Sequence, residues 1–268
     1  MDSINFYLLI FTFINFLIIL KFDQIEIFHL LLDKPNSSRK FHLKPVPIAG
    51  GLIVIINLFI FFIITIFDKN IISNEVFFDD KNEFYFFFLI STLIFILGYL
   101  DDMFDINANL KFLLLSLLIF IILILDESLN IKSLSISFIN EEINLSYISF
   151  FFSCFCFLVF INSFNMFDGI NLQSAFYSII ILTSLILFYS NSLLLKILLI
   201  VFITYSYLNF KNKSFLGDGG SLLISFIIGY LFIKLYNLEK ISFADEIFIF
   251  MMIPGIDMVR LFFKRILN

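Results

Sequence analysis

The sequence predicts an all-α protein, a polytopic bundle of about nine transmembrane helices. Of its 268 residues, 61% are hydrophobic and only 15% are charged, and the mean hydropathy is +1.04. A soluble domain of this length needs far less apolar content to fill its core, so the excess apolar surface is expected to face lipid. Backbone polar groups inside a bilayer must be satisfied within their own segment, which predicts helical spans.

Apolar stretches of about membrane-spanning length recur along the whole chain. A span needs roughly 20 apolar residues, and nine stretches approach or reach that length: 4–21, 48–67, 84–100, 110–125, 147–163, 172–189, 192–209, 221–236 and 243–263. The first has no basic region before it and no small-residue cleavage site, so we interpret it as a retained span. Cys154 and Cys156 lie within one span on different helix faces and are interpreted as small apolar residues. We expect one transmembrane domain over residues 1–268.

The distribution of charge predicts the orientation of the bundle. If every stretch crosses the membrane, the gaps after the first, third, fifth and seventh stretches lie on one side with the C-terminus. That side carries eleven of the seventeen basic residues and a net charge of +2, whereas the other side carries −7. Basic residues concentrate on the cytoplasmic side, so the N-terminus is expected outside. The acidity lies mainly on outer loops and indicates no nucleic-acid partner. One outer segment, 126–146, alternates in polarity and is expected to form a small hairpin.

Five polar patches fall in the gaps on the predicted cytoplasmic side. They are DKPNSSRKFHLKPVPIAGG (33–51), LGYLDDMFD (97–105), NSFNMFDGIN (162–171), FLGDGGS (215–221) and DMVRLFFKRILN (257–268). Polar residues far apart in the sequence are therefore expected to meet at one aqueous face.

The first patch is basic. Lys34, Arg39, His42 and Lys44 could form a clamp for phosphate groups, including the phosphate of a lipid. The alternative is an ordinary positive-inside loop that meets anionic lipid headgroups.

The second patch places Asp101, Asp102 and Asp105 where the third span ends. On a helix, Asp101 and Asp105 share a face and Asp102 points about 100° away. Crowded carboxylates repel one another unless a cation or a shared proton relieves the repulsion. The alternative is a solvated helix end.

In the third patch, Asn162, Asn165, Asp168 and Asn171 recur every third residue, and the first three could line one ridge of a helix. Amides suit recognition of a base or a sugar, and Asp168 could assist a metal ion or hold a substrate. The alternative is an amide-rich helix terminus.

The fourth patch surrounds Asp218 with glycines before a span. The free N–H groups of a helix start favour anions, and Asp218 could hold Mg²⁺, which takes one or two carboxylates together with phosphate oxygens and water. The alternative is a turn before a span. The GK[ST] ending of a nucleotide-binding P-loop is absent.

Acidic groups, amides and a basic loop on one membrane face suit phosphoryl transfer between a soluble phosphorylated donor and a lipid acceptor. A transporter using intramembrane acids as a relay is the main rival, but it predicts acids at mid-span and broken helices at the midplane.

The ordered set DKPN, PVPIAGG, LDDMFDI, NSFNMFDGIN, FLGDGGS and IPGIDMV resembles the polyprenyl-phosphate N-acetylhexosamine-1-phosphate transferases, of glycosyltransferase family 4 type. The resemblance runs over about residues 33–265 and is nearer to the undecaprenyl-phosphate GlcNAc-1-phosphate transferases than to the phospho-MurNAc-pentapeptide transferases. It implies transfer of a HexNAc-1-phosphate from a UDP-sugar to undecaprenyl phosphate with release of UMP, as the first membrane step of cell-envelope polysaccharide synthesis. It also implies Mg²⁺ (with Mn²⁺ as an alternative), a bacterial inner-membrane location and a homodimer as one oligomeric alternative.

The resemblance implies roles for individual positions. Asp101 and Asp102 match adjacent aspartates near the lipid phosphate, one of which deprotonates it. Asp218 matches a Mg²⁺-binding aspartate, and Asn165 and Asp168 match residues that line the nucleotide-sugar site.

The chain departs from the family pattern in two places. Asn171 stands where many relatives carry a second aspartate. Relatives also continue past DMVRLFFKR into a histidine-containing loop and a further span, so the chain is expected to lack both. An inactive remnant that only packs against partners is therefore an alternative to the enzyme.

Overall fold

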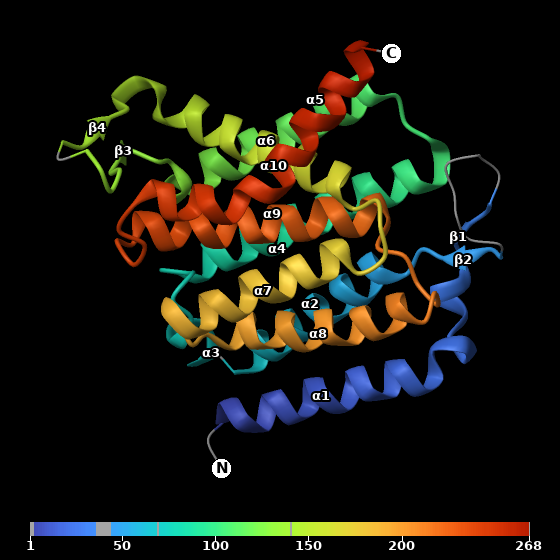
Figure 1. The fold of residues 1–268 in the computed structure, drawn as a ribbon. Helices are drawn as coiled ribbons and strands as arrows, with labels where there is room; N and C mark the ends of the chain where they lie inside the picture. The colour runs from blue at the N-terminus through green and yellow to red at the C-terminus, as the bar shows by residue number, and fades with distance from the viewer. Residues whose placement is uncertain (1–2, 36–43, 69, 140, 268) are drawn as a thin grey trace.

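The computed structural model describes residues 3–35, 44–68, 70–139 and 141–267, and it is an all-α bundle of the polytopic membrane type (Figure 1). Its α-helices are α1 (Ser3–Lys21), α2 (Gly50–Phe67), α3 (Asn70–Asn74), α4 (Lys81–Phe104), α5 (Ala108–Leu125), α6 (Ser149–Phe167), α7 (Gln173–Phe188), α8 (Leu193–Phe210), α9 (Gly217–Asn237) and α10 (Ala244–Leu267). Short 3-10 helices are η1 (Phe22–Gln24), η2 (Glu26–His29), η3 (Glu127–Leu129) and η4 (Ser146–Ile148).

Within the described ranges, the nine predicted stretches each coincide with one of the nine longer helices, and α3 is an additional short one. Seven helical segments of the described chain are long and apolar enough to cross a membrane, and they contain α1, α2, α4, α5, α6, α8 and α9. Helix α7 is apolar but has only 16 residues. Helix α10 mixes apolar and charged residues and contains Pro254.

In the part of the chain that the structure describes, two small antiparallel pairs of strands lie outside the bundle. The predicted hairpin is confirmed: β3 (Ser133–Leu134) pairs with β4 (Ile143–Asn144). The second pair, β1 (Leu32–Asp33) with β2 (Val46–Pro47), closes the basic loop that precedes α2 and was not expected.

Helix α9 is the centre of the bundle. Nearly all of its residues are buried, and it contacts α2, α4 and α6, while α1, α5, α7, α8 and α10 lie further out (Figure 1). Small residues, among them Gly220, Ser221, Ser225 and Gly229, run along it. Such residues allow close packing where the surroundings offer no hydrophobic driving force between helices.

The polar gaps do lie together. The loops after α1, α4, α6 and α8 and the end of α10 are all at one end of the bundle, on the right in Figure 1. The link from α2 to α4, the β3–β4 hairpin and the turns after α7 and α9 are at the other end. This arrangement follows from an alternating up-and-down path of the helices, as the spacing of the apolar stretches predicts.

Candidate active site

The carboxylate of Asp102, near the end of α4, forms hydrogen bonds with the beginning of α9. Asp102 Oδ1 accepts a hydrogen bond from the Asp218 backbone N–H and Asp102 Oδ2 accepts one from that of Gly219, both at 3.0 Å. The first N–H groups of a helix have no partner within it and favour negative charge. The helix start that the sequence indicated as an anion site is thus occupied by a carboxylate of the protein itself.

Two glycines permit this close approach. A Cβ at Gly98 would lie 2.5 Å from the backbone oxygen of Asp218, which is too close for any side chain. Gly217, directly before the capped residues, has φ +75°, a conformation that residues with a Cβ rarely adopt. The two backbones therefore meet only because these positions carry no side chain.

The segment before α2 lies beside the same helix start. Phe215 donates its N–H to Pro47 O and accepts from Gly50 N, each at 2.9 Å, and Gly51 N donates to Leu216 O at 3.1 Å. These bonds bring the closing part of the first polar patch against the fourth. Of the predicted phosphate-binding residues in this loop, Lys34 and Lys44 are exposed, and Arg39 and His42 lie outside the described residues.

A lysine from α5 connects the two aspartates that face each other. Lys111 Nζ donates to Asp101 Oδ2 at 2.6 Å and also to Asp218 Oδ2. The side chains of Lys111 and Asp101 are 14% and 12% exposed, whereas that of Asp218 is 35% exposed. Of the two carboxylates that Lys111 contacts, Asp218 is therefore the more open to a ligand.

Sequence reasoning missed Lys111 as a site residue and counted it only among the basic residues of the cytoplasmic side. One signal was available, because it is the only basic residue between Lys81 and Lys132 and follows the aspartate patch by one short turn. A lone cation near three carboxylates is a natural counterion.

Asn165 completes the group from α6. Its amide is oriented by its neighbours: Nδ2 donates to Asp218 Oδ1 at 3.1 Å and Oδ1 accepts from Lys111 Nζ at 3.2 Å. The amide thus contacts both the aspartate and the lysine, and α4, α5, α6 and α9 each supply one member of the cluster Asp101, Lys111, Asn165 and Asp218.

Asp168 lies just beyond α6 and accepts a hydrogen bond from the Ser174 hydroxyl. Burial, together with the negative charge of Asp218, raises the pKa of Asp168 to about 6 against the opposing effect of the Ser174 hydrogen bond. Asp168 is therefore close enough to respond electrostatically to the cluster. Asn162 is directed elsewhere, since its Nδ2 donates to Leu158 O of its own helix at 2.7 Å.

The donor set fits a hard divalent cation. Asp101 and Asp218 offer carboxylate oxygens, the ligands that Mg²⁺ and Mn²⁺ prefer, and a single lysine faces these two carboxylates. Within the described residues, no group of three or more acidic, His or Cys side chains converges as a full cation cage. Such a set suits an ion whose remaining ligands are water and phosphate oxygens.

The geometry argues against the transporter alternative. The cluster lies where α4 ends and α9 begins, at one end of the bundle, and both helices are continuous. A relay would instead require acids near mid-span and interrupted helices.

Comparison with known proteins gives a consistent result. Three bacterial relatives can be aligned over 88% of this chain and 64% of their own length, so the chain spans less than two thirds of their length. They are the undecaprenyl-phosphate alpha-N-acetylglucosaminyl 1-phosphate transferases of Salmonella typhi (24% identical) and Yersinia pestis (27%), and a probable undecaprenyl-phosphate N-acetylglucosaminyl 1-phosphate transferase of Bacillus subtilis (25%).

The sequence model of one family, described as glycosyl transferase family 4, matches residues 84–236. The match covers more than half of the chain and includes Asp101, Asp102, Lys111, Asn165 and Asp218. The chain therefore belongs to glycosyl transferase family 4.

Proposed function

We propose that this protein transfers a HexNAc-1-phosphate, with GlcNAc as the sugar, from a UDP-sugar to undecaprenyl phosphate and releases UMP. The observation that carries the proposal is the cluster Asp101, Lys111, Asn165 and Asp218 at one end of an apolar bundle. A water-soluble donor can reach that end from the aqueous phase, while a polyprenyl acceptor can reach it from the bilayer. The names of the aligned relatives support the same reaction and favour GlcNAc over a MurNAc-pentapeptide donor.

In the proposed reaction, an oxygen of the lipid phosphate attacks the β-phosphorus of the donor. A new P–O bond forms, the bond between the β-phosphorus and the bridging oxygen breaks, and UMP leaves with that oxygen. Most of the catalytic effect in such transfers comes from positioning and from neutralising charge on the phosphoryl oxygens. Mg²⁺ or Mn²⁺, when bound, would supply a positive charge shared by the phosphates and the protein's carboxylates.

The chain's own residues take different parts. Asp218, the more exposed of the two carboxylates that Lys111 contacts, would hold the cation, and Asn165 lies beside it. Lys111 would neutralise phosphoryl oxygens. Asp101 would accept a proton from the lipid phosphate. Asp102, both of whose oxygens accept backbone N–H groups, would act as a positioning residue for the start of α9.

The test is a transfer assay on the full chain in membranes, with radiolabelled UDP-GlcNAc, undecaprenyl phosphate and Mg²⁺. The expected result is label in the lipid fraction and one UMP released for each labelled lipid. Release of UDP would overturn the proposal, because it means transfer of the sugar without its phosphate. Absence of any labelled lipid would favour the inactive remnant, and labelling only from UDP-MurNAc-pentapeptide would favour the other family branch.

A further inference from the structure

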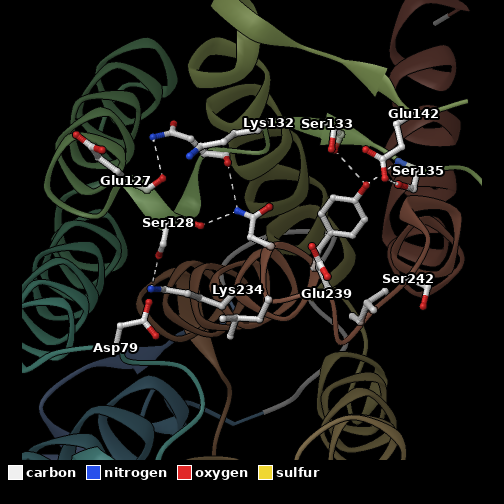
Figure 2. Close-up of a pocket in the computed structure, with 15 residues that line it drawn as sticks. Asp79, Glu127, Ser128, Lys132, Ser133, Ser135, Glu142, Lys234, Glu239 and Ser242 are labelled. Atoms are coloured by element: carbon white, nitrogen blue, oxygen red, sulfur yellow. Dashed lines mark hydrogen bonds between the residues drawn. The ribbon is translucent and has the colours of Figure 1, made fainter.

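A second polar site lies at the opposite end of the bundle. A pocket of about 590 Å³ is formed there by η3 and the residues that follow it, the β3–β4 hairpin, the end of α9 and the turn towards α10 (Figure 2). Helix α9 has 21 residues and is therefore about 30 Å long, and the aspartate cluster lies at its other end. The pocket is thus separate from the candidate active site.

The wall of this pocket is fixed by hydrogen bonds between elements that are distant in sequence. Asn237 Nδ2 donates to Ser128 O at 2.6 Å, and Tyr236 Oη donates to Ser133 O at 3.1 Å. The Ser135 N–H in turn donates to Tyr236 Oη at 2.8 Å. Figure 2 shows these bonds along the pocket wall. Pockets with preformed walls bind ligands at a lower entropic cost.

A buried lysine anchors the same wall. Lys234 is 2% exposed and donates to the Ser128 hydroxyl (Figure 2). It also forms ion pairs with Glu83 at 2.7 Å and Asp126 at 3.1 Å. A buried ammonium needs such partners. Its charge is already balanced by two carboxylates that lie outside the pocket lining, so it adds little positive potential to the pocket itself.

The remaining charges of the lining are mostly negative. Asp79, Glu127, Glu142 and Glu239 line the pocket, with Lys132 as the other cation. In the part of the chain that the structure describes, the side chains of Asp79, Glu127 and Glu239 form no hydrogen bond or ion pair with another residue. These carboxylates are therefore available to a ligand.

We propose that this pocket binds a small organic molecule that carries two or more ammonium groups. The volume lies within the range of about 300–1,000 Å³ for sites of small molecules. The carboxylates surround the pocket and do not converge as a cage for one metal ion within the described residues. Several separated charges of one sign match a ligand that carries several separated charges of the other sign. Anionic ligands would be repelled.

Isothermal titration calorimetry on the full chain in a non-ionic detergent tests the proposal. Spermidine and kanamycin serve as probes, because both carry several ammonium groups but only kanamycin is a sugar. Both are expected to bind, and added NaCl is expected to weaken the binding because the contacts are exposed to solvent.

Variants locate the site. Glu127→Gln and Glu142→Gln are each expected to weaken spermidine binding by about three- to fivefold. Glu141→Gln is the matched control, since Glu141 is exposed on the same hairpin and does not line the pocket. Thermal unfolding of each variant establishes that it folds as the wild type does.

Three results would overturn the proposal. The first is no binding of either amine. The second is equal weakening by Glu141→Gln and Glu142→Gln, which would indicate nonspecific attraction to an acidic surface. The third is equally tight binding of glucose or of Mg²⁺ alone, which would indicate a neutral sugar site or a cation site.

Discussion

Replacing Asp102 by Ala should loosen the start of α9 as well as affect chemistry. The carboxylate of Asp102 accepts the backbone N–H groups of Asp218 and Gly219, both at 3.0 Å, across the junction with α4. Without it, two N–H groups at the beginning of the central helix lose their partner. The backbone that carries Asp218 would then be held less firmly.

The size of the effect follows from these two bonds. A hydrogen bond to a charged group contributes roughly 1.5–3 kcal/mol, and the cost of desolvating the carboxylate offsets part of the sum. We expect a loss of about 3 kcal/mol in the free energy of unfolding, somewhat above a typical N-cap substitution of ~1 kcal/mol. For a chain of this size, that loss lowers the melting temperature by roughly 6–12 °C.

The assay is thermal unfolding of the full chain in detergent, run beside the transfer assay. Asp102→Asn, which keeps one oxygen acceptor, should fall between wild type and Asp102→Ala. Asp101→Asn is the matched control, because Asp101 contacts Lys111 rather than the backbone of α9. It should lower transfer with a smaller change in melting temperature. A melting temperature of Asp102→Ala equal to that of the wild type would refute the positioning role.

Three further predictions concern neighbouring positions. Gly98→Ala should destabilise the protein by about 1–3 kcal/mol, because the added Cβ would lie 2.5 Å from the backbone oxygen of Asp218. Gly255→Ala is the control and should leave stability unchanged, because nothing lies within 4 Å of the added Cβ. Thermal unfolding of both variants checks this. Lys111→Met should slow transfer about tenfold or more, because Asp101 and Asp218 lose their shared counterion. A transfer rate equal to that of the wild type at every Mg²⁺ concentration would show that Lys111 has no such role. The pKa of Asp168 is raised to about 6, so the folded state binds a proton at this carboxyl more tightly than the unfolded state does. The contribution of Asp168 to the free energy of unfolding therefore falls as the pH rises towards 6. Asp168→Asn should therefore raise the melting temperature at pH 8 relative to wild type but not at pH 4, and a gain of the same size at both values would show that the charge is irrelevant.

Much of the architecture could be predicted because lipid imposes it. The length of an apolar stretch and the need to satisfy its backbone fix both the helices and their alternating direction. That alternation also predicts that the polar gaps meet, and Asp101, Asn165 and Asp218 indeed lie together. The alternating segment 126–146 forms its hairpin for an equally local reason.

What escaped prediction depends on contacts between distant positions. Asp102 and Asp218 are 116 residues apart, and no periodicity in the sequence shows that one carboxylate caps the helix of the other. Adjacent aspartates look equivalent in sequence, yet Asp101 faces a lysine and Asp102 faces backbone. Lys111 looked like one more positive-inside residue, but α5 packs against α4 and α6 and brings this lysine to Asp101 and Asp218. Asn162 fitted the three-residue period, but its amide bonds to its own helix.

The most direct measurement is the rate of UMP release from UDP-GlcNAc and undecaprenyl phosphate as Mg²⁺ is varied, for wild type and for Asp218→Asn. If Asp218 holds the metal, wild-type release is expected to require Mg²⁺, to stop on addition of EDTA and to return when Mg²⁺ is restored. Loss of the Asp218 carboxylate should lower the rate by about 100-fold or more, as expected when one electrostatic stabiliser of the transition state is removed. Metal-independent release, or an Asp218→Asn protein as fast as the wild type, would contradict it.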